Sequence, residues 1–381
     1  MAAVLVLCFL SVFGWGALGL HPDHIATELE PQLSVLAEMG TEKDVATTVR
    51  YCISKDIPFL APNGGHGWAE TFHLGPQGLL ILTIGGGAVI SDVITAAAEN
   101  NALVLTGNCN CVGTLGAVLG AGYGNLMGLL GLGVDNVLSL NVVLPNGSLK
   151  TVTAANDDDD DDDDETADLF WALRSAGPNF GIVTSATMKP YPVPPSARPI
   201  VAWTGMFLFF TTTGPPQYTP RVSASAGFCT KGGNKPAYRA GLARLDAETW
   251  RKTWEEYVAF AARNSTERSL VFLEAYSMGK ARSLPESSSV FPWRDRVNFN
   301  ATIIPWYQDT RLRDLWWETD ECDASAAYVN FAYGDEDLRT IYGGSVERLQ
   351  ALKESIDPDN VFNQWYPLSD NARWSRGFEK T

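Results

Sequence analysis

The segment from residue 107 to residue 138, GNCNCVGTLGAVLGAGYGNLMGLLGLGVDNVL, decides the class of fold. Residues 113–134 within it contain eight glycines and no charged side chain. Length and apolarity alone fit a helix that spans a membrane, but each glycine destabilises a helix by roughly 1 kcal/mol relative to alanine. We therefore interpret the segment as backbone that lies close to a flat ligand or to another stretch of backbone.

The residues before this segment alternate between helix and strand. The sequence Thr41-Glu-Lys-Asp44 resembles a capping box and precedes apolar residues at helical spacing, which predicts a helix over 42–54. Residues 57–61 form an apolar run that predicts a buried strand, followed by the loop Asn63-Gly-Gly-His-Gly67. A further helix and strand are expected at 92–100 and 102–105. This alternation predicts a layered α/β or α+β domain.

The residues after the segment contain a hairpin and then a change of character. Residues 137–144 and 148–153 alternate around Pro145-Asn-Gly147 and predict a β-hairpin. Proline-rich sequence at 190–196 marks a domain boundary. The remaining elements are expected as helices at 167–174, 247–263 and 345–356 and as strands at 182–188 and 297–304.

Composition excludes two classes of function. The chain has 381 residues, 45% of them hydrophobic, and a formal net charge of −16, so it lacks the basic face that a nucleic-acid-binding protein needs. Nine acidic residues lie in one run, 157–165, and the rest of the chain has 35 acidic and 28 basic residues. Mutual repulsion predicts a solvated loop for this run; a calcium site is the alternative. Four histidines and six scattered cysteines predict no metal site.

The first 20 residues are uncharged and begin with the apolar sequence MAAVLVLCFL. They predict a secretory signal peptide at residues 1–20, with an uncleaved anchor as the alternative. We expect cleavage, a secreted protein and no stable membrane association. Three glycosylation sequons, at Asn146, Asn264 and Asn300, agree with secretion. Cleavage leaves five cysteines, and an odd number requires at least one thiol outside any disulfide.

Common nucleotide-binding and hydrolase motifs are absent from the sequence. Four segments instead resemble the berberine bridge enzyme-like FAD-linked oxidoreductases, which belong to the vanillyl-alcohol oxidase type and have a PCMH-type FAD-binding domain. The resemblance is nearest to the fungal branch. The segments are GGHG at 64–67, the glycine-rich sequence at 107–138, DLFWALRSAGPNFGIVTSATM at 168–188 and YGGSVERLQALKESIDPDNVF at 342–362. Together they cover about residues 40–192 and 325–368, in the order found in the family.

The resemblance implies an FAD that is held by two covalent bonds. His66 matches the histidine of the family's GGH motif, which bonds the flavin 8α-methyl group. Cys109 stands three residues before Val112 and matches the cysteine that bonds flavin C6; Cys111 is the competing candidate. A cysteine that bonds flavin also accounts for a thiol outside the disulfides. The other residues assigned to FAD binding are Gly107, Val112, Gly113, Gly116, Gly120, Gly122, Asn179, Gly181 and Val183; for the glycines the alternative is tight packing of backbone.

The resemblance also implies a proton-accepting residue in a substrate domain. The sequence AAYVNFAYGDEDL resembles the family's Y-x-N segment, so Tyr328 is the predicted catalytic base, with a buried structural tyrosine as the alternative. Glu274, Asn300 and Thr302 are weaker candidates for contact with substrate. Trp250 and Trp254 could stack on a sugar, although their helical spacing favours the core.

The expected fold is therefore α+β. Residues 30–192 form the two-subdomain FAD-binding domain, residues 193–337 form a substrate domain with an antiparallel sheet backed by helices, and residues 338–372 return to the FAD-binding domain. The expected activity is oxidation of an alcohol or amine carbon in a carbohydrate or secondary metabolite, with FAD as cofactor, a small-molecule substrate and O₂ as acceptor. A dehydrogenase that passes its electrons to a quinone or a protein is the alternative. The oligomeric state stays open.

Two segments are shorter than in the family. Leu79 to Thr83 runs almost directly into Gly85-Gly-Gly87, and the stretch between Asp309 and Asp323 is short. A missing strand exposes apolar surface at a sheet edge. The alternative function is therefore a non-catalytic relative that has lost FAD through internal deletions.

Overall fold

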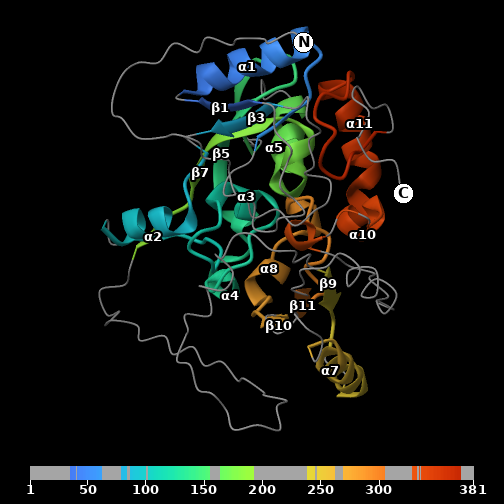
Figure 1. Cartoon of the computed structure of the whole chain (residues 1–381). Helices are drawn as coiled ribbons and strands as arrows, with labels where there is room; N and C mark the ends of the chain where they lie inside the picture. Colours follow the sequence, from blue (N-terminus) through green and yellow to red (C-terminus); the bar gives the residue numbers. More distant parts are fainter. Residues whose placement is uncertain are drawn as a thin grey trace, which may run out of the picture.

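A computed structural model describes residues 35–39, 41–61, 79–83, 86–99, 102–154, 164–192, 238–244, 247–261, 269–304, 328–332, 334 and 336–369 (Figure 1). Helices and small sheets are combined, so the predicted α+β fold class is confirmed. The expected signal peptide, His66, Asn264 and nearly all of the acidic run lie outside the described residues.

A parallel sheet with the order β1-β3-β2 lies near the N-terminus, where helix α1 packs beside it (Figure 1). Its strands are β1 Val35–Met39, β2 Phe59–Leu60 and β3 Leu79–Thr83. Helix α1, Glu42–Ser54, has the predicted bounds because Thr41 caps it by accepting a hydrogen bond from the backbone N–H of Asp44. Its buried face of Val45, Ala46, Val49 and Cys52 joins Phe59 and Phe362 in a small core.

An antiparallel sheet with the order β6-β5-β7 forms the centre of the larger core. Its strands are β5 Val137–Val143, β6 Leu149–Thr153 and β7 Ile182–Met188. Strands β5 and β6 form the predicted hairpin, and β7 has the predicted bounds. Helix α5, Asp164–Ala176, is longer than the expected 167–174 and bends at Ser175, whose φ is 128°.

The glycine-rich segment folds into short pieces. It contains α3 Thr114–Leu119, α4 Met127–Leu130 and the 3₁₀ turn η3 Gly133–Asn136. In the part of the chain that the structure describes, no helix is long and apolar enough to cross a membrane. Beside the segment lie α2 Ile90–Glu99, β4 Ala102–Leu103 and β8 Tyr191–Pro192, the last two paired as antiparallel strands. Helix α2 begins at Ile90, before the expected cap at Ser91, because the Asp92 side chain accepts from the Val89 N–H.

A second antiparallel sheet, with the order β10-β11-β9, lies at the opposite end of the molecule from α1 (Figure 1). Its strands are β9 Tyr238–Leu242, β10 Leu270–Ala275 and β11 Phe299–Ile304. Helix α7 Ala247–Ala261, helix α8 Gly279–Arg282 and turn η5 Glu286–Ser288 belong to the same part of the chain. Trp254 is 40% exposed, so the expectation that it lies in the core is wrong: its position on α7 leaves the indole open to solvent.

The C-terminal segment packs back on α5. It contains η6 Val329–Phe331, α10 Leu338–Tyr342, η7 Gly343–Ser345 and α11 Val346–Ile356. On α11, Lys353 is buried and its ammonium binds the Asp357 carboxylate at 2.6 Å and the carbonyls of Asn179 and Phe362 at 2.7 Å. These bonds tie the end of α11 to turn η4, Gly177–Asn179, and thus to the entrance of β7.

Candidate functional site

The loop that carries Cys109 is fixed by backbone hydrogen bonds. The Val112 N–H donates to the Cys109 carbonyl at 3.1 Å, and the Val112 carbonyl accepts from the Ile90 N–H at 2.9 Å. Gly113 pairs with Val89 in an isolated antiparallel bridge. The start of α2 therefore holds this loop in place at the N-terminus of α3.

The two candidate cysteines differ in chemical state. Cys109 keeps its thiol and is half-buried, whereas Cys111 is disulfide-bonded. Their sulfur atoms are 3.5 Å apart. Burial raises the pKa of the Cys109 thiol, and a hydrogen bond from the Cys111 backbone acts in the opposite direction. Of these two cysteines, Cys109 is the one that is not part of a disulfide.

The N-terminus of α3 forms a cradle with open space. Gly113 is the N-cap and supplies no side-chain hydrogen bond to the helix. The Thr114 hydroxyl is buried and has no hydrogen-bond partner. A methyl group built on Gly116 meets no atom within 4 Å, whereas one built on Gly107 lies 2.8 Å from the Ile90 side chain. Thr114 and Gly116 thus leave hydrogen-bonding capacity and room for a bound group.

The glycines after α3 are in contact with protein. A Cβ on Gly120 lies 1.9 Å from the Asn330 side chain, and a Cβ on Gly122 lies 2.7 Å from the Gly133 backbone. Gly122 also has a φ of +76°, which glycine adopts without strain. In this structure both glycines serve close packing, the alternative left open by the sequence.

Asn179, Gly181 and Val183 lie around the entrance to β7. Asn179 is fully buried, its Nδ2 donates to the Tyr342 hydroxyl at 3.4 Å, and its Oδ1 has no hydrogen-bond partner. A Cβ on Gly181 lies 2.6 Å from the Val143 carbonyl oxygen. Val183 is half-buried and pairs with Val142 across the sheet. Asn179 is the member of this group with spare hydrogen-bonding capacity.

Tyr328 is buried against the glycine-rich segment. Its hydroxyl accepts from the Gly122 N–H at 3.2 Å and from Asn330 Nδ2 at 2.9 Å, and donates to the Ala117 carbonyl at 3.5 Å. The ring centroid is 4.6 Å from that of Tyr123. These contacts join the C-terminal segment to the end of α3.

Glu274 and Asn300 are direct partners on strands β10 and β11, and therefore lie on the same face of the sheet. Asn300 is buried and Glu274 is half-buried. In the same ladder Thr302 pairs with Phe272; the Thr302 side chain is not among the described ones. The structure thus brings two of the three expected substrate residues together.

Tyr276 and Asn108 belong to this cluster and were missed by the sequence analysis. The Tyr276 hydroxyl donates to Glu274 Oε1 at 2.8 Å and accepts from Asn108 Nδ2. The signal was the spacing of Glu274 and Tyr276, two residues apart at a strand end, which favours one face. Asn108 could not be found in this way, because it lies 168 residues from Tyr276 in the sequence.

Tyr123 lies at the centre of the aromatic part of the cluster. Its ring contacts those of Tyr276 at 5.9 Å, Phe291 at 5.9 Å and Tyr328 at 4.6 Å. Burial raises the pKa of Tyr123; the neighbouring Tyr328 and Glu274 add to this effect, while Asn300 opposes it. This phenol therefore stays neutral at ordinary pH.

A buried ion pair joins the glycine-rich segment to the part of the chain around β10 and β11. Arg294 Nη1 and Nη2 donate to the two carboxylate oxygens of Asp135 at 2.8 and 2.6 Å. Arg294 also donates to the Ser289 hydroxyl at 2.7 Å. This pairing offsets the cost of burying the two charges, although among the described residues the buried Arg294 Nε–H has no hydrogen-bond partner.

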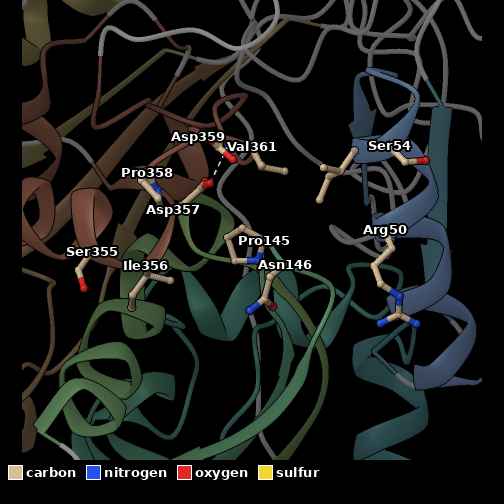
Figure 2. Close-up of a pocket in the computed structure, with 11 residues that line it drawn as sticks. Arg50, Ser54, Pro145, Asn146, Ser355, Ile356, Asp357, Pro358, Asp359 and Val361 are labelled. Carbon is tan, nitrogen blue, oxygen red and sulfur yellow. Dashed lines mark hydrogen bonds between the residues drawn. The ribbon is translucent and has the colours of Figure 1, made fainter.

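A cavity of about 440 Å³ lies elsewhere, between α1, the β5–β6 turn and the end of α11 (Figure 2). Arg50, Ser54, Asn146 and Asp359 are among its lining residues. None of the residues assigned to FAD binding lines it. In the described ranges, no group of three or more His, Cys, Asp or Glu is placed to hold a metal ion.

Comparisons with known proteins assign the class of this chain. Residues 33–153 match the FAD binding domain family, and residues 327–365 match the berberine and berberine-like family. An FAD-linked oxidoreductase of Pyricularia oryzae is 29% identical, over 89% of this chain and 84% of its own length. The resemblance to the berberine bridge enzyme-like FAD-linked oxidoreductases is therefore confirmed, with an FAD binding domain match at residues 33–153 and a berberine-like match at residues 327–365.

Solved structures show the same fold. A xylooligosaccharide oxidase of Myceliophthora thermophila superimposes with a TM-score of 0.70 at 17% identity, over 91% of this chain and 94% of the other. A glucooligosaccharide oxidase of Acremonium strictum, which carries a 6-S-cysteinyl, 8α-N1-histidyl FAD, superimposes with a TM-score of 0.64 at 16% identity, over 91% and 94% of the two chains. The fold is thus that of the PCMH-type FAD oxidases.

The relatives contain residues that this chain lacks. The match with the Pyricularia protein extends over 443 positions, whereas 89% of this 381-residue chain is about 339 residues. About 104 of the aligned positions therefore have no residue in this chain. Other fungal FAD-linked oxidoreductases give a difference of similar size. The chain is internally shorter than these relatives, as the sequence analysis expects.

Proposed function

We propose that the protein is a secreted FAD-dependent oxidase that oxidises an alcohol or amine carbon of a carbohydrate or secondary metabolite and uses O₂ as acceptor. The observation that carries this proposal is the half-buried Cys109 thiol and its neighbours. The preceding residue, Asn108, donates a hydrogen bond to the Tyr276 hydroxyl, and that hydroxyl donates one to the Glu274 carboxylate. The proposed attachment point is thus close to side chains that could move a proton.

The residues present fit an FAD. The unpartnered Thr114 hydroxyl and the open side of Gly116 offer a place for the cofactor at the start of α3. The unpartnered Asn179 Oδ1 offers a further acceptor. Cys109 and His66 are the proposed attachment points. When bound, FAD supplies the two-electron acceptor for the substrate carbon.

The chain contributes positioning, exclusion of water and proton transfer. The aromatic rings of Tyr123, Phe291 and Tyr328 form an apolar wall beside the polar pair of Glu274 and Tyr276. A substrate hydroxyl or amine placed against that pair can lose its proton while its carbon loses a hydride. The related carbohydrate oxidases support a sugar as one class of substrate.

Secretion and glycosylation are part of the proposal. They rest on the uncharged N-terminal sequence and on the exposed sequon Asn146-Gly-Ser148 in the β5–β6 turn (Figure 2). Asn300 is buried in strand β11, so that sequon is closed to the glycosylation machinery in the folded protein. Mass spectrometry of protein from a secretory eukaryotic host, with and without glycosidase, tests for a glycan at Asn146 and for cleavage near residue 20.

The experiment that tests the oxidase activity is a screen for hydrogen peroxide. The purified yellow protein is mixed with xylo- and cello-oligosaccharides, monosaccharides and aromatic alcohols in air, and oxygen uptake is recorded alongside peroxide. Equal amounts of O₂ consumed and peroxide formed support an oxidase. Substrate-dependent bleaching of the flavin without O₂ uptake contradicts the oxidase and indicates a dehydrogenase.

A second candidate function is a non-catalytic flavoprotein relative. It is favoured by the residues that the chain lacks relative to its family, about 104 positions in the comparison with the Pyricularia protein. A folded protein that binds no FAD supports this candidate, and a yellow protein contradicts it.

A further inference from the structure

The hydroxyl of Tyr328 is fully used by the fold. A phenolic oxygen can accept two hydrogen bonds and donate one. The Gly122 N–H and Asn330 Nδ2 donate to the two acceptor positions, and the phenolic O–H donates to the Ala117 carbonyl. Tyr328 is also buried. The Tyr328 oxygen therefore has no acceptor position left for a proton from the substrate. None of these three partners is an ionisable group that could take the phenolic proton of Tyr328.

The hydroxyl of Tyr276 has different surroundings. Its proton points to Glu274 Oε1 at 2.8 Å, and a carboxylate is a group that can take that proton. Asn108 Nδ2 donates to the phenolic oxygen, which stabilises negative charge on it. Tyr276 is half-buried, whereas Tyr328 is buried.

The same contacts locate Tyr276 beside the proposed attachment point. Asn108 precedes Cys109 directly, and its Oδ1 accepts from the Asn125 N–H at 2.9 Å, which fixes the amide in the loop. Glu274 is an ionisable side chain in contact with Tyr276, and Glu274, Tyr328 and Arg294 also act on the neighbouring Tyr123.

We propose that Tyr276, rather than Tyr328, accepts the proton from the substrate hydroxyl or amine, and that Glu274 takes the proton that Tyr276 gives up. The inference rests on the proposed function. The substrate O–H or N–H bond breaks and a new Tyr276 O–H bond forms, while the former phenolic proton moves to the Glu274 carboxylate. The substrate carbon is oxidised by two electrons, which leave with its hydrogen as hydride to FAD. Asn108 is a positioning residue for Tyr276.

The test compares three phenylalanine variants of the full-length flavin-loaded protein. The probe is the compound that gives the most peroxide in the screen above, and the rate of flavin bleaching is followed without oxygen. Tyr276→Phe is expected to lower this rate about 10²–10⁴-fold, the range for loss of a general base. Tyr257→Phe, a phenol on α7 outside the site, is the matched control and should leave the rate unchanged. Tyr328→Phe should lower the melting temperature of the protein and leave the rate of flavin bleaching close to that of wild type.

Two further readouts do not depend on turnover. Flavin content and bleaching by dithionite should equal wild type in Tyr276→Phe, which shows that the variant keeps its cofactor. Tyrosinate absorbance near 295 nm, taken as the difference between proteins with and without Tyr276, reports the ionisation of that residue. Glu274→Gln should move this ionisation to lower pH, because an opposing negative charge is removed.

The outcomes separate this inference from the proposed function. A yellow, active protein in which Tyr276→Phe keeps its rate and Tyr328→Phe loses it overturns the inference and leaves the function standing. An unchanged ionisation of Tyr276 in Glu274→Gln also overturns the inference. A colourless wild-type protein overturns the proposed function, and with it this role of Tyr276.

Discussion

At the residue scale, Gly116 and Gly120 in one short segment have opposite surroundings. A Cβ on Gly120 collides with the Asn330 side chain, which is held by hydrogen bonds to Ala117 and Tyr328 and cannot move without losing them. A Cβ on Gly116 meets no protein atom within 4 Å. The pair therefore separates a glycine needed for packing, Gly120, from one that the proposed function assigns to the cofactor, Gly116.

Gly120→Ala is expected to destabilise the protein by about 1–3 kcal/mol, the usual cost of overpacking. Gly116→Ala should leave the free energy of unfolding unchanged or raise it by up to about 1 kcal/mol, since alanine favours helix. The same change should lower FAD incorporation, because the added methyl group fills the cradle. Urea unfolding of flavin-free protein and the flavin-to-protein absorbance ratio measure the two effects. Normal FAD content in Gly116→Ala would count against the cradle.

The site shows which residues sequence can assign. The positions of Cys109 and Tyr328 follow from local motifs, so the sequence analysis could name both. The partners of Tyr328 could not be named in the same way, because Gly122 lies 206 residues away in the chain. The role of Tyr276 was missed for the same reason: its bond to Asn108 depends on how two distant parts of the chain pack.

At the element scale, Glu42 connects helix α1 to the central sheet. Its Oε1 accepts from the Thr184 hydroxyl at 2.7 Å, the Ser185 hydroxyl at 3.1 Å and Asn141 Nδ2 at 3.2 Å. These bonds, the one from Thr184 foremost, lower the pKa of Glu42 below its ordinary value of 4.5, and burial opposes them in part. The charged carboxylate is thus what ties α1 to strands β5 and β7.

This contact predicts a pH-dependent effect of Glu42→Gln. Because the folded-state pKa lies below the unfolded one, the carboxylate stabilises the fold above about pH 4.5, and the stabilisation is lost as the pH falls through the folded-state pKa. The variant should be less stable than wild type by about 1 kcal/mol at pH 7, and by less at pH 3. Chemical unfolding at both pH values measures this, with Glu248→Gln on exposed α7 as control. A difference that is the same at both pH values contradicts the account.

Elements with strong local signals were predicted well. Helix α1 and strand β7 have the predicted bounds because a cap and a clear apolar pattern define them. Helix α5 was predicted too short, since its first turn lies in the acidic sequence that we interpreted as solvated loop. The four-residue helix α4 was not predicted at all, because glycine-rich sequence has no helical periodicity and its fold depends on packing with α8 and η3.

At the scale of the whole molecule, the pair Arg294–Asp135 joins the glycine-rich segment to the part that carries Tyr276. Both side chains are almost fully buried, at 2% and 3% exposure. Arg294→Met is expected to destabilise the protein by about 3–5 kcal/mol, because it leaves a buried carboxylate without its partner. Lys252→Met, which breaks an exposed pair with Glu248, should cost at most about 1 kcal/mol. Thermal and urea unfolding measure both, and equal effects of the two variants contradict this role for the buried pair.

The internal shortening of the chain also acts at this scale. The described core around β5, β7, α5 and α11 is continuous, and Val183, one of the residues assigned to FAD binding, packs against it. The shortening therefore bears on cofactor loading more than on the fold of this core. Loading of FAD is accordingly the property on which the whole account depends.

The most direct test is the fate of the flavin in acid. The protein is produced in a secretory eukaryotic host and precipitated in acid, and visible spectra of pellet and supernatant are recorded for wild type, Cys109→Ser, His66→Ala and the double variant. The account predicts yellow pellets for wild type and both single variants, with peptide mapping that assigns the two bonds, and flavin released into the supernatant or absent only in the double variant. A folded wild-type protein without colour contradicts the account.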